Sequence, residues 1–364
     1  MAPIKKHEYL LADGRQLIYF DDADTLLSPT RLPDTRVLDA RPATATMRQD
    51  PLTAEWISIA AARQNRVFLP PAHLDPLAPA SATNPSEVPD NYDVAVFENR
   101  SPSFGPALGK ADSSFDFAAV GVERSHPSIG RCEVVCFSPE HEGSFGSLTQ
   151  SRARTVIEAW ADRTAVLSAL PGVQQVFPFE NRGEAIGVTL HHPHGQIYSY
   201  PYVTPRTQRL ISSIDNFGAG LFESILESER SSERVVLSGA HWSAFVPFAA
   251  RWPLEVHLLP HRQIPDFAAT SDQERDELAG LYLTLLRGID ALYDTPTPYI
   301  AAWHQAPVTS HREEIRLMLQ LTSPRRSSDK FKFLAGSEAA MGAWIGDVAP
   351  EQSAEFIRKG IATL

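Results

Sequence analysis

The chain has 364 residues, of which 43% are hydrophobic and 21% charged, a composition that is ordinary for a globular protein with a sizeable core. Its formal net charge of −11, without a basic stripe interleaved with aromatic residues, argues against a nucleic acid partner. No apolar run approaches the ~20 residues of a membrane-spanning helix or resembles a signal peptide, so we expect a cytoplasmic protein without a membrane partner.

The first third of the chain combines short predicted strands with long connections, including a Pro/Ala/Ser-rich loop at 70–89. Polar residues gather where two of these strands end: Arg63 and Arg66 follow the strand at 55–60, and Asn99 follows the next strand. Two arginines three residues apart can clamp a phosphate, because each planar guanidinium bonds two oxygens. They can equally form a solvated surface, and the residues alone leave both interpretations open.

The chain contains only two cysteines, Cys132 and Cys136, on a predicted strand that ends at Pro139. Residues four apart on a strand are separated by ~13 Å, which is too far for a disulfide bond. We therefore expect two reduced, partly buried thiols, as is usual in a cytoplasmic protein. A zinc site built on a Cys-x-x-Cys pair is excluded, because the chain has no such pair.

The rest of the chain repeats the predicted order strand, helix, strand, strand. The first helix is expected to begin with a capping box at 147–150 and the second with one at 271–274. A helical stretch at 208–228 links the two copies. The pattern predicts an α+β fold of two units, 1–207 and 208–364, with a largely antiparallel sheet and flanking helices.

The most reactive stretch closes the first copy and reads HHPHGQ, residues 191–196. We expect a strand to enter this stretch and to place His192, His194 and Gln196 on one face. Pro193 has no N–H for a sheet ladder, so the stretch should lie at an edge or a strand end. Two imidazoles and a carboxamide on one face predict a reactive surface, because Pro and Gly would spoil a strand whose only task was packing.

The second copy has lost this reactive face. Met318 and Gln320 occupy the positions of the two histidines. We therefore expect unit 1–207 to carry the active site. Unit 208–364 should serve as a degenerate scaffold and partner surface with an appended tail.

Several further motifs occur in order along nearly the whole chain after about residue 45: WIS at 56–58, FEN at 97–99, CFSPEH at 136–141, FENRG at 179–183, WHQAP at 303–307 and KFLAGSE at 332–338. Together with His-x-His-x-Gln at the end of a duplicated unit, they resemble the galactose-1-phosphate uridylyltransferase family of the histidine-triad superfamily. One His-x-His alone would be a weak signal, whereas several motifs in the same order are specific. The resemblance implies a fold of duplicated histidine-triad-like units.

The resemblance also implies a ping-pong transfer of UMP. His194 would attack the α-phosphorus of UDP-glucose and become uridylylated, releasing glucose 1-phosphate, and galactose 1-phosphate would then take the UMP to give UDP-galactose. An imidazole suits the first step, since its ordinary pKa near ~6.5 leaves it largely neutral and nucleophilic at pH 7. Covalent capture splits one difficult transfer into two easier ones.

Other residues match the family's catalytic and substrate contacts. Gln196 is implied to donate an amide hydrogen bond to the α-phosphate. His192 is grouped with these catalytic residues, as a structural residue or a remnant metal ligand. The residues implied to hold phosphate and nucleotide are Arg63, Arg66, Asn99, Asn181 and Thr189. The tail residues implied to contact the hexose from the neighbouring subunit, and hence to require a homodimer, are Lys332, Phe333 and Glu338. Trp344 stands where the family has a glutamine that contacts the sugar, which leaves hexose specificity open.

Two metal sites of the family are altered in this chain. His141 and His192 match two zinc ligands and Asp75 could supply an oxygen, but Ala78 replaces a cysteine. The resemblance therefore implies at most a remnant zinc site. At the iron site of some members only His304 survives, so we expect no iron. In the family neither metal performs the chemistry.

Two other functions stay open. A nucleotide phosphorylase of the same superfamily, acting on ADP-glucose or a dinucleoside polyphosphate, would use the same His194 with inorganic phosphate as acceptor. The tail at 332–338 favours a hexose phosphate acceptor, since inorganic phosphate needs no such closure. A non-catalytic nucleotide-binding module would instead bind a nucleotide sugar without becoming covalently labelled.

Overall fold

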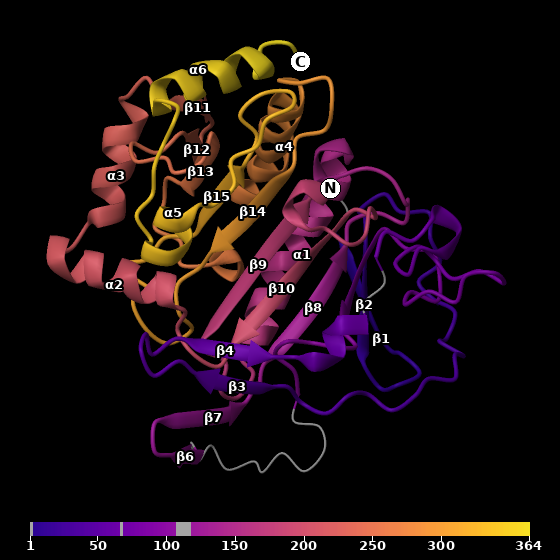
Figure 1. Ribbon diagram of the computed structural model, residues 1–364. Coiled ribbons are helices and arrows are strands. Elements are labelled where there is room, and N and C mark those ends of the chain that lie inside the picture. Colours follow the sequence, from indigo (N-terminus) through magenta and orange to yellow (C-terminus); the bar gives the residue numbers. More distant parts are fainter. Residues whose placement is uncertain (1–2, 66–67, 107–117) are drawn as a thin grey trace.

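The computed structural model describes residues 3–65, 68–106 and 118–364 and is built around one large antiparallel sheet (Figure 1). This sheet has eleven strands in the order β1 (Lys5–Leu10), β2 (Gln16–Asp21), β5 (Val94–Glu98), β8 (Arg131–Cys136), β10 (His194–Tyr200), β9 (Gln175–Arg182), β14 (Tyr299–His304), β15 (Met318–Ser323), β13 (Leu254–Pro260), β12 (Trp242–Phe245) and β11 (Val235–Ser238). A smaller sheet, at the lower edge of Figure 1, has the order β4 (Trp56–Ile59), β3 (Thr46–Gln49), β7 (Glu123–Pro127) and β6 (Ala118–Val120).

Two long helices, α1 (Gln150–Ser168) and α4 (Asp272–Asp290), lie side by side on one face of the large sheet. The other α-helices surround its second half: α2 (Pro205–Phe217), α3 (Leu221–Arg230), α5 (Gly336–Met341) and α6 (Pro350–Ile361). Short 3-10 segments occur at η1 (Ala61–Asn65), η2 (Ala72–Leu74), η3 (Phe145–Ser147), η4 (Glu184–Ile186) and η5 (Phe267–Ala269). Within the described ranges, no helix has the length and apolar character needed to cross a membrane.

The duplication expected from the sequence is present in the sheet. In the first copy β8, α1, β9 and β10 follow one another along the chain, and in the second copy β13, α4, β14 and β15 do so. The copies lie in the sheet as β8-β10-β9 and β14-β15-β13, and they meet where β9 pairs with β14. The predicted α+β class with a largely antiparallel sheet is confirmed.

The main core lies between the two long helices and the sheet. Trp160 of α1 and Tyr282 of α4 both pack on Trp303 of β14, with ring centroids 5.8 and 5.7 Å apart. All three side chains are buried. Because these rings come from both copies, their packing joins the two units into one hydrophobic core.

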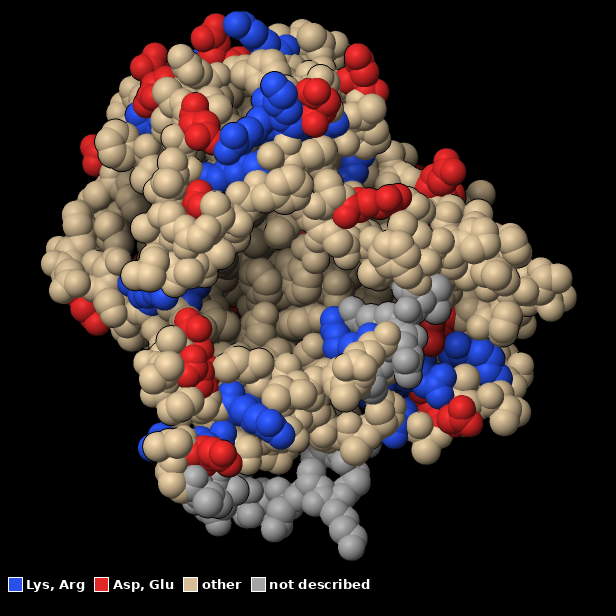
Figure 2. Space-filling view, in the orientation of Figure 1, with Lys and Arg blue, Asp and Glu red and all other residues tan. Residues whose placement is uncertain are grey.

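The opposite face of the sheet is only partly covered. The loop after η2 packs Leu77, Val88 and Tyr92 onto the first strands of the sheet, and the small sheet covers Tyr198 and its neighbours. Figure 2 shows a hollow in this face, in front of the central strands, with few charged side chains inside it. Alternate residues of β10 therefore stay half-buried on this open face.

The structure corrects one predicted helix start and refines another element. Thr149 caps α1 by accepting a backbone N–H at 3.1 Å, so the capping box expected at 147–150 was wrong. The box expected at 271–274 is confirmed for α4, with reciprocal bonds of 2.7 and 3.3 Å. The helical stretch expected at 208–228 is divided into α2 and α3 at Gly218, whose φ of +91° favours glycine.

The core contains one carboxyl group close to the junction of the two copies. Glu180 on β9 is 4% exposed and accepts a hydrogen bond of 3.0 Å from the hydroxyl of Tyr299 on β14. Burial raises the pKa of Glu180 to about 7, although Arg182 and Tyr299 act in the opposite direction. The carboxyl is therefore neutral in mildly acidic solution.

The raised pKa of Glu180 should make the free energy of unfolding depend on pH, and Glu180→Gln should remove this dependence. Between the ordinary pKa of 4.5 and the folded value of about 7, the folded chain binds one proton more than the unfolded chain. The stabilisation from Glu180 is therefore fully present below pH 4.5 and is lost as the pH rises to about 7. The loss amounts to roughly 3 kcal/mol in the free energy of unfolding. Urea unfolding near pH 5 and near pH 8 should show a larger loss for the wild type than for the variant. Equal losses would contradict the shifted pKa.

Candidate active site

Strand β10 sends alternate side chains to the two faces of the sheet. His194, Gln196 and Tyr198 point to the open face, whereas Gly195 is directed toward the helices. A Cβ added at Gly195 would lie 2.8 Å from the ring of Phe137. Glycine is thus needed for close packing behind the strand while the reactive side chains stand in front of it.

His194 is held in one orientation and one tautomer. Its Nδ1 lies 2.7 Å from the main-chain oxygen of His192. Because a carbonyl oxygen only accepts, Nδ1 carries the hydrogen and the neutral ring keeps its lone pair on Nε2. An imidazole held in this way is suited to nucleophilic attack.

His192 lies just before β10, and its ring is buried, whereas that of His194 is half-buried. β10 begins only at His194, because Pro193 has no N–H to offer the ladder. The ring of His192 is 2% exposed, its Nδ1 donates to Oδ2 of Asp75 at 2.7 Å, and its Nε2 lies 2.8 Å from the main-chain oxygen of Ser138. The ring is therefore covered by the loop after η2 and by the segment that follows β8.

Two cavities meet at His194. The larger has a volume of about 410 Å³ and is lined by four predicted site residues: Asn99, Thr189, His194 and Gln196. Its apolar walls include Leu77, Phe97 and Val134. The smaller has a volume of about 190 Å³ and is lined by three predicted residues: Asn181, His192 and His194. The fold thus gathers residues from distant parts of the first unit on both sides of one imidazole.

Asp75 lies between the two histidines of the predicted remnant zinc site. Its Oδ2 accepts hydrogen bonds from Nδ1 of His141 at 2.8 Å and from Nδ1 of His192 at 2.7 Å. Burial alone would raise the pKa of Asp75, but the hydrogen bond and charge of His192, the N–H of Leu77 and the bond from His141 outweigh it and lower this pKa to about 2. Asp75 is therefore a carboxylate at neutral pH.

These donors do not fit a four-coordinate zinc ion. Nδ1 of each imidazole donates to Asp75 and so has no lone pair for a metal, and Nε2 of His192 faces Ser138 and Tyr92. Ala78 supplies no ligand either, so too few donors are left for a four-coordinate site. Over residues 3–65, 68–106 and 118–364, no three His, Cys, Asp or Glu side chains are arranged to hold a metal ion. Their geometry is that of a hydrogen-bonded cluster.

The position of the implied iron site holds another chain of hydrogen bonds. Nε2 of His304 lies 3.1 Å from Oε1 of Gln320, and Gln320 donates to Glu255 at 2.7 Å. Glu255 lies 3.2 Å from Nε2 of His257. Burial, together with the charge of Arg206, lowers the pKa of His304 to about 3. These polar groups are therefore engaged with one another.

Arg63 lies beside the row of side chains on β10. Its Nη1 donates to the hydroxyl of Tyr198 at 3.3 Å. Tyr198 shares its face with Gln196, two residues away and hence ~7 Å along the strand. Arg63 is thus near the open face, and Arg66 lies outside the described residues.

The predicted tail residues lie in the second unit. Lys332 is 3% exposed, and its Nζ lies 3.5 Å from Oε1 of Glu338 and 5.8 Å from the ring centre of Trp344. Phe333 is instead 73% exposed. Among the described residues, the linings of the two cavities at His194 contain no tail residue of the same chain.

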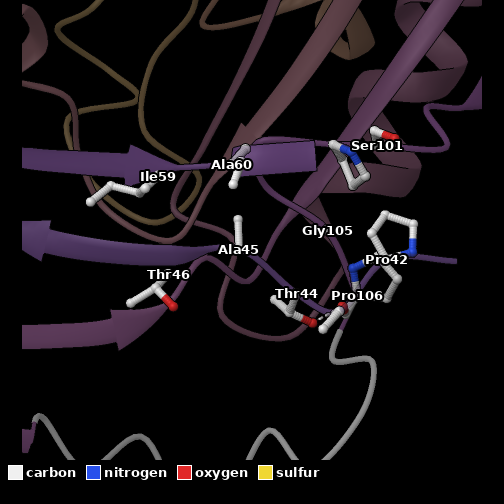
Figure 3. Close-up of a pocket in the computed structure, with 12 residues that line it drawn as sticks. Pro42, Thr44, Ala45, Thr46, Ile59, Ala60, Ser101, Gly105 and Pro106 are labelled. Carbon is white, nitrogen blue, oxygen red and sulfur yellow. Dashed lines mark hydrogen bonds between the residues drawn. The ribbon is translucent and has the colours of Figure 1, made fainter. Parts of the chain in front are cut away.

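A third cavity, of about 270 Å³, lies between the small sheet and the segment 101–106 (Figure 3). Its described lining consists of Pro, Ala, Thr, Ile, Ser and Gly residues and has no charged or titratable side chain. Ser101 lines both this cavity and the larger one at His194, so the two are neighbours. The chemistry of its lining does not make it a reactive site.

Three residues of the site were missed in the sequence. The hydroxyl of Tyr92 lies 2.9 Å from Nε2 of His192, Ser138 supplies the oxygen opposite the same nitrogen, and Tyr198 receives Arg63. The alternation that placed Gln196 beside His194 could also have found Tyr198. No local pattern could have found Tyr92, which is 100 residues away from His192.

Comparisons with known proteins agree with one another. The family model for the galactose-1-phosphate uridyl transferase N-terminal domain matches residues 38–204, and that for the C-terminal domain matches 202–362. Galactose-1-phosphate uridylyltransferase of Streptomyces lividans is 42% identical over 98% of both chains, and that of Thermotoga maritima is 33% identical over 86% of this chain and 98% of its own. A solved uridylyltransferase structure has a TM-score of 0.76 at 27% identity, covering 87% of this chain and 99% of that one. The chain therefore belongs to the galactose-1-phosphate uridylyltransferase family.

Proposed function

We propose that this chain converts UDP-glucose and galactose 1-phosphate into glucose 1-phosphate and UDP-galactose. The supporting observation is the hydrogen bond from Nδ1 of His194 to the His192 carbonyl, which puts the lone pair on Nε2 where the two cavities meet. A nucleotidyl transfer through a covalent intermediate needs such a nucleophile between a nucleotide site and a hexose phosphate site.

In the first half-reaction, Nε2 of His194 bonds to the α-phosphorus of UDP-glucose. The bond from phosphorus to the bridging oxygen breaks, and glucose 1-phosphate leaves with the electron pair. Positive charge develops on the ring, and the bond from Nδ1–H to the His192 carbonyl strengthens as it does so. In the second half-reaction, a phosphate oxygen of galactose 1-phosphate attacks the same phosphorus and the ring becomes neutral again.

The larger cavity suits the nucleotide. It combines apolar walls, where a base and ribose can pack, with the polar groups of Asn99 and Thr189. Gln196 is next to His194 on the same face and can donate its amide N–H to the α-phosphate without adding charge. We propose that Asn181 also holds the nucleotide. The proposed phosphate contacts are Arg63, Arg66 and Thr189.

We propose that a second subunit completes the binding site for the hexose. Phe333 is exposed, and Lys332 and Glu338 are buried beside each other in the same tail, which is absent from the cavity linings described for the same chain. These three residues would contact the hexose in the partner's site, which requires a homodimer. In this proposal unit 1–207 performs the reaction in the cytoplasm, unit 208–364 supplies the tail, and neither a nucleic acid nor a membrane takes part.

Covalent labelling tests the nucleophile. Incubation with UDP-glucose and no acceptor should add one UMP to the chain by intact mass, because the first half-reaction can proceed alone. His194→Gly should abolish the label. His261→Gly, which removes a histidine of the second unit, is the control and should be labelled like the wild type.

The same experiment separates the other candidate functions. Labelling by AMP from ADP-glucose, with none from UDP-glucose, would replace the proposal by a phosphorylase. Binding of both nucleotide sugars without any label would replace it by a non-catalytic nucleotide-binding module. Labelling that persists in His194→Gly would contradict the assigned nucleophile.

Gln196→Ala should lower kcat by roughly 10²- to 10³-fold, as expected for the loss of a donor to developing charge. The KM for UDP-glucose should change much less, since the contact strengthens in the transition state. Gln175→Ala is the matched control: it removes a buried glutamine of β9 that bonds Thr207 at 2.7 Å, and should lower Tm while leaving kcat unchanged. Steady-state kinetics measure both variants. An unchanged kcat for Gln196→Ala would contradict its role.

A further inference from the structure

The cluster around Asp75 joins three distant segments of the first unit. Asp75 follows η2, Ser138 follows β8, and His192 precedes β10. Asp75 and His192 are 1% and 2% exposed. One carboxylate oxygen receives a hydrogen from each of two imidazoles, at 2.7 Å for His192 and 2.8 Å for His141. These are the distances of charge-assisted hydrogen bonds. Atoms that bind one tetrahedral zinc ion, each ~2.0–2.3 Å from the metal, lie farther apart from one another than this.

The ring of His192 is fixed from both sides. Opposite Asp75, its Nε2 lies 2.8 Å from the main-chain oxygen of Ser138 and 2.9 Å from the hydroxyl of Tyr92. That hydroxyl also lies 2.8 Å from the main-chain oxygen of Leu77, in the same loop as Asp75. Every polar atom of the ring thus has a partner, and the loop is tied to the ring at two points.

The backbone of His192 is hydrogen-bonded to the proposed nucleophile. The main-chain oxygen of His192 accepts the hydrogen on Nδ1 of His194 at 2.7 Å. The next residue is also tied down, because Phe137 N–H donates to the oxygen of Pro193 at 3.0 Å. A rotation of the His192 backbone would move the acceptor away from Nδ1 and release the tautomer of His194.

We propose that Asp75, His141, Tyr92 and His192 form a metal-free latch that holds the His192 carbonyl in place and thereby keeps the lone pair of His194 on Nε2. Asp75, His141 and Tyr92 are positioning residues, since they act through His192. The inference rests on the proposed role of His194 as nucleophile. It adds that hydrogen bonds alone do the orienting in this chain.

Metal analysis is the first part of the test. The full-length protein, produced in zinc-supplemented medium, should contain far less than one zinc per chain, and a chelator should leave its Tm and kcat unchanged. One zinc per chain, whose removal lowers Tm, would overturn the metal-free latch.

Substitution of Asp75 is the second part. Asp75→Asn should lower kcat about 10- to 100-fold with little change in KM, because the nucleophile is misoriented while the cavities persist. Asp21→Asn is the matched control. Asp21, the last residue of β2, is 1% exposed, is paired with His7 and Arg31, and lies outside the site. It should lower Tm without changing kcat. A similar kcat for both variants would overturn the positioning role.

A spectroscopic measurement reports the tautomer itself. In histidine ¹⁵N spectra of the wild type, the ring of His194 should show hydrogen on Nδ1, and Asp75→Asn should shift it toward a mixture of tautomers. Tyr92→Phe removes one contact to His192 without changing charge and should move kcat and the tautomer in the same direction by less. If Asp75→Asn does not fold, Tyr92→Phe alone tests the latch. An unchanged tautomer of His194 in the variant that folds would overturn it.

Failure of the latch and failure of the proposed function give different results. If wild-type protein is not labelled by UDP-glucose, the proposed function fails whatever the metal content. If the wild type is labelled but Asp75→Asn and Tyr92→Phe label at the wild-type rate, the function stands and the latch is wrong.

Discussion

The site depends on one interruption of a hydrogen-bond ladder. Pro193 has no N–H, so β10 cannot extend beyond His194. The two histidines on either side of it therefore leave the backbone in different surroundings: His194 stands on the open face, and His192 is buried against Asp75. The proline thus separates a half-buried imidazole on the strand from a buried one before it.

Features that depend on residues close together in the chain could be predicted from the sequence, whereas contacts between distant residues could not. The cap of α4 and the alternation of His194 and Gln196 are set within a few residues, and both appear in the structure. The duplicated unit was also visible, because its periodicities change in the same order twice. The burial of His192 depends on Asp75, 117 residues away, and no local pattern reports that contact. Where a helix begins was equally hard to read at 147–150, since several small polar residues there can serve as caps.

The second copy has the same order of elements as the first, but Met318 and Gln320 stand at the positions of the two histidines. Gln320 accepts from or donates to its neighbours on two sides, bridging His304 and Glu255, and Glu255 also lies beside His257. Buried polar groups need such partners, because each unsatisfied one is costly. The first copy directs a nitrogen lone pair into a cavity, whereas the described polar groups of this cluster are directed at each other. The two copies thus differ in where the polar atoms of their imidazoles are directed.

The pairing of β9 with β14 has a consequence for how the chain is made. Asn181 pairs with Ile300, so the partner strand is synthesised more than a hundred residues after β9. Until then the first unit, with its own strands already able to pair, has an open sheet edge at β9 with unpaired backbone groups. Such an edge is a template for pairing with another chain. While the second half is translated, this edge is therefore open to pairing with another chain, and a pause between the two units would lengthen that interval.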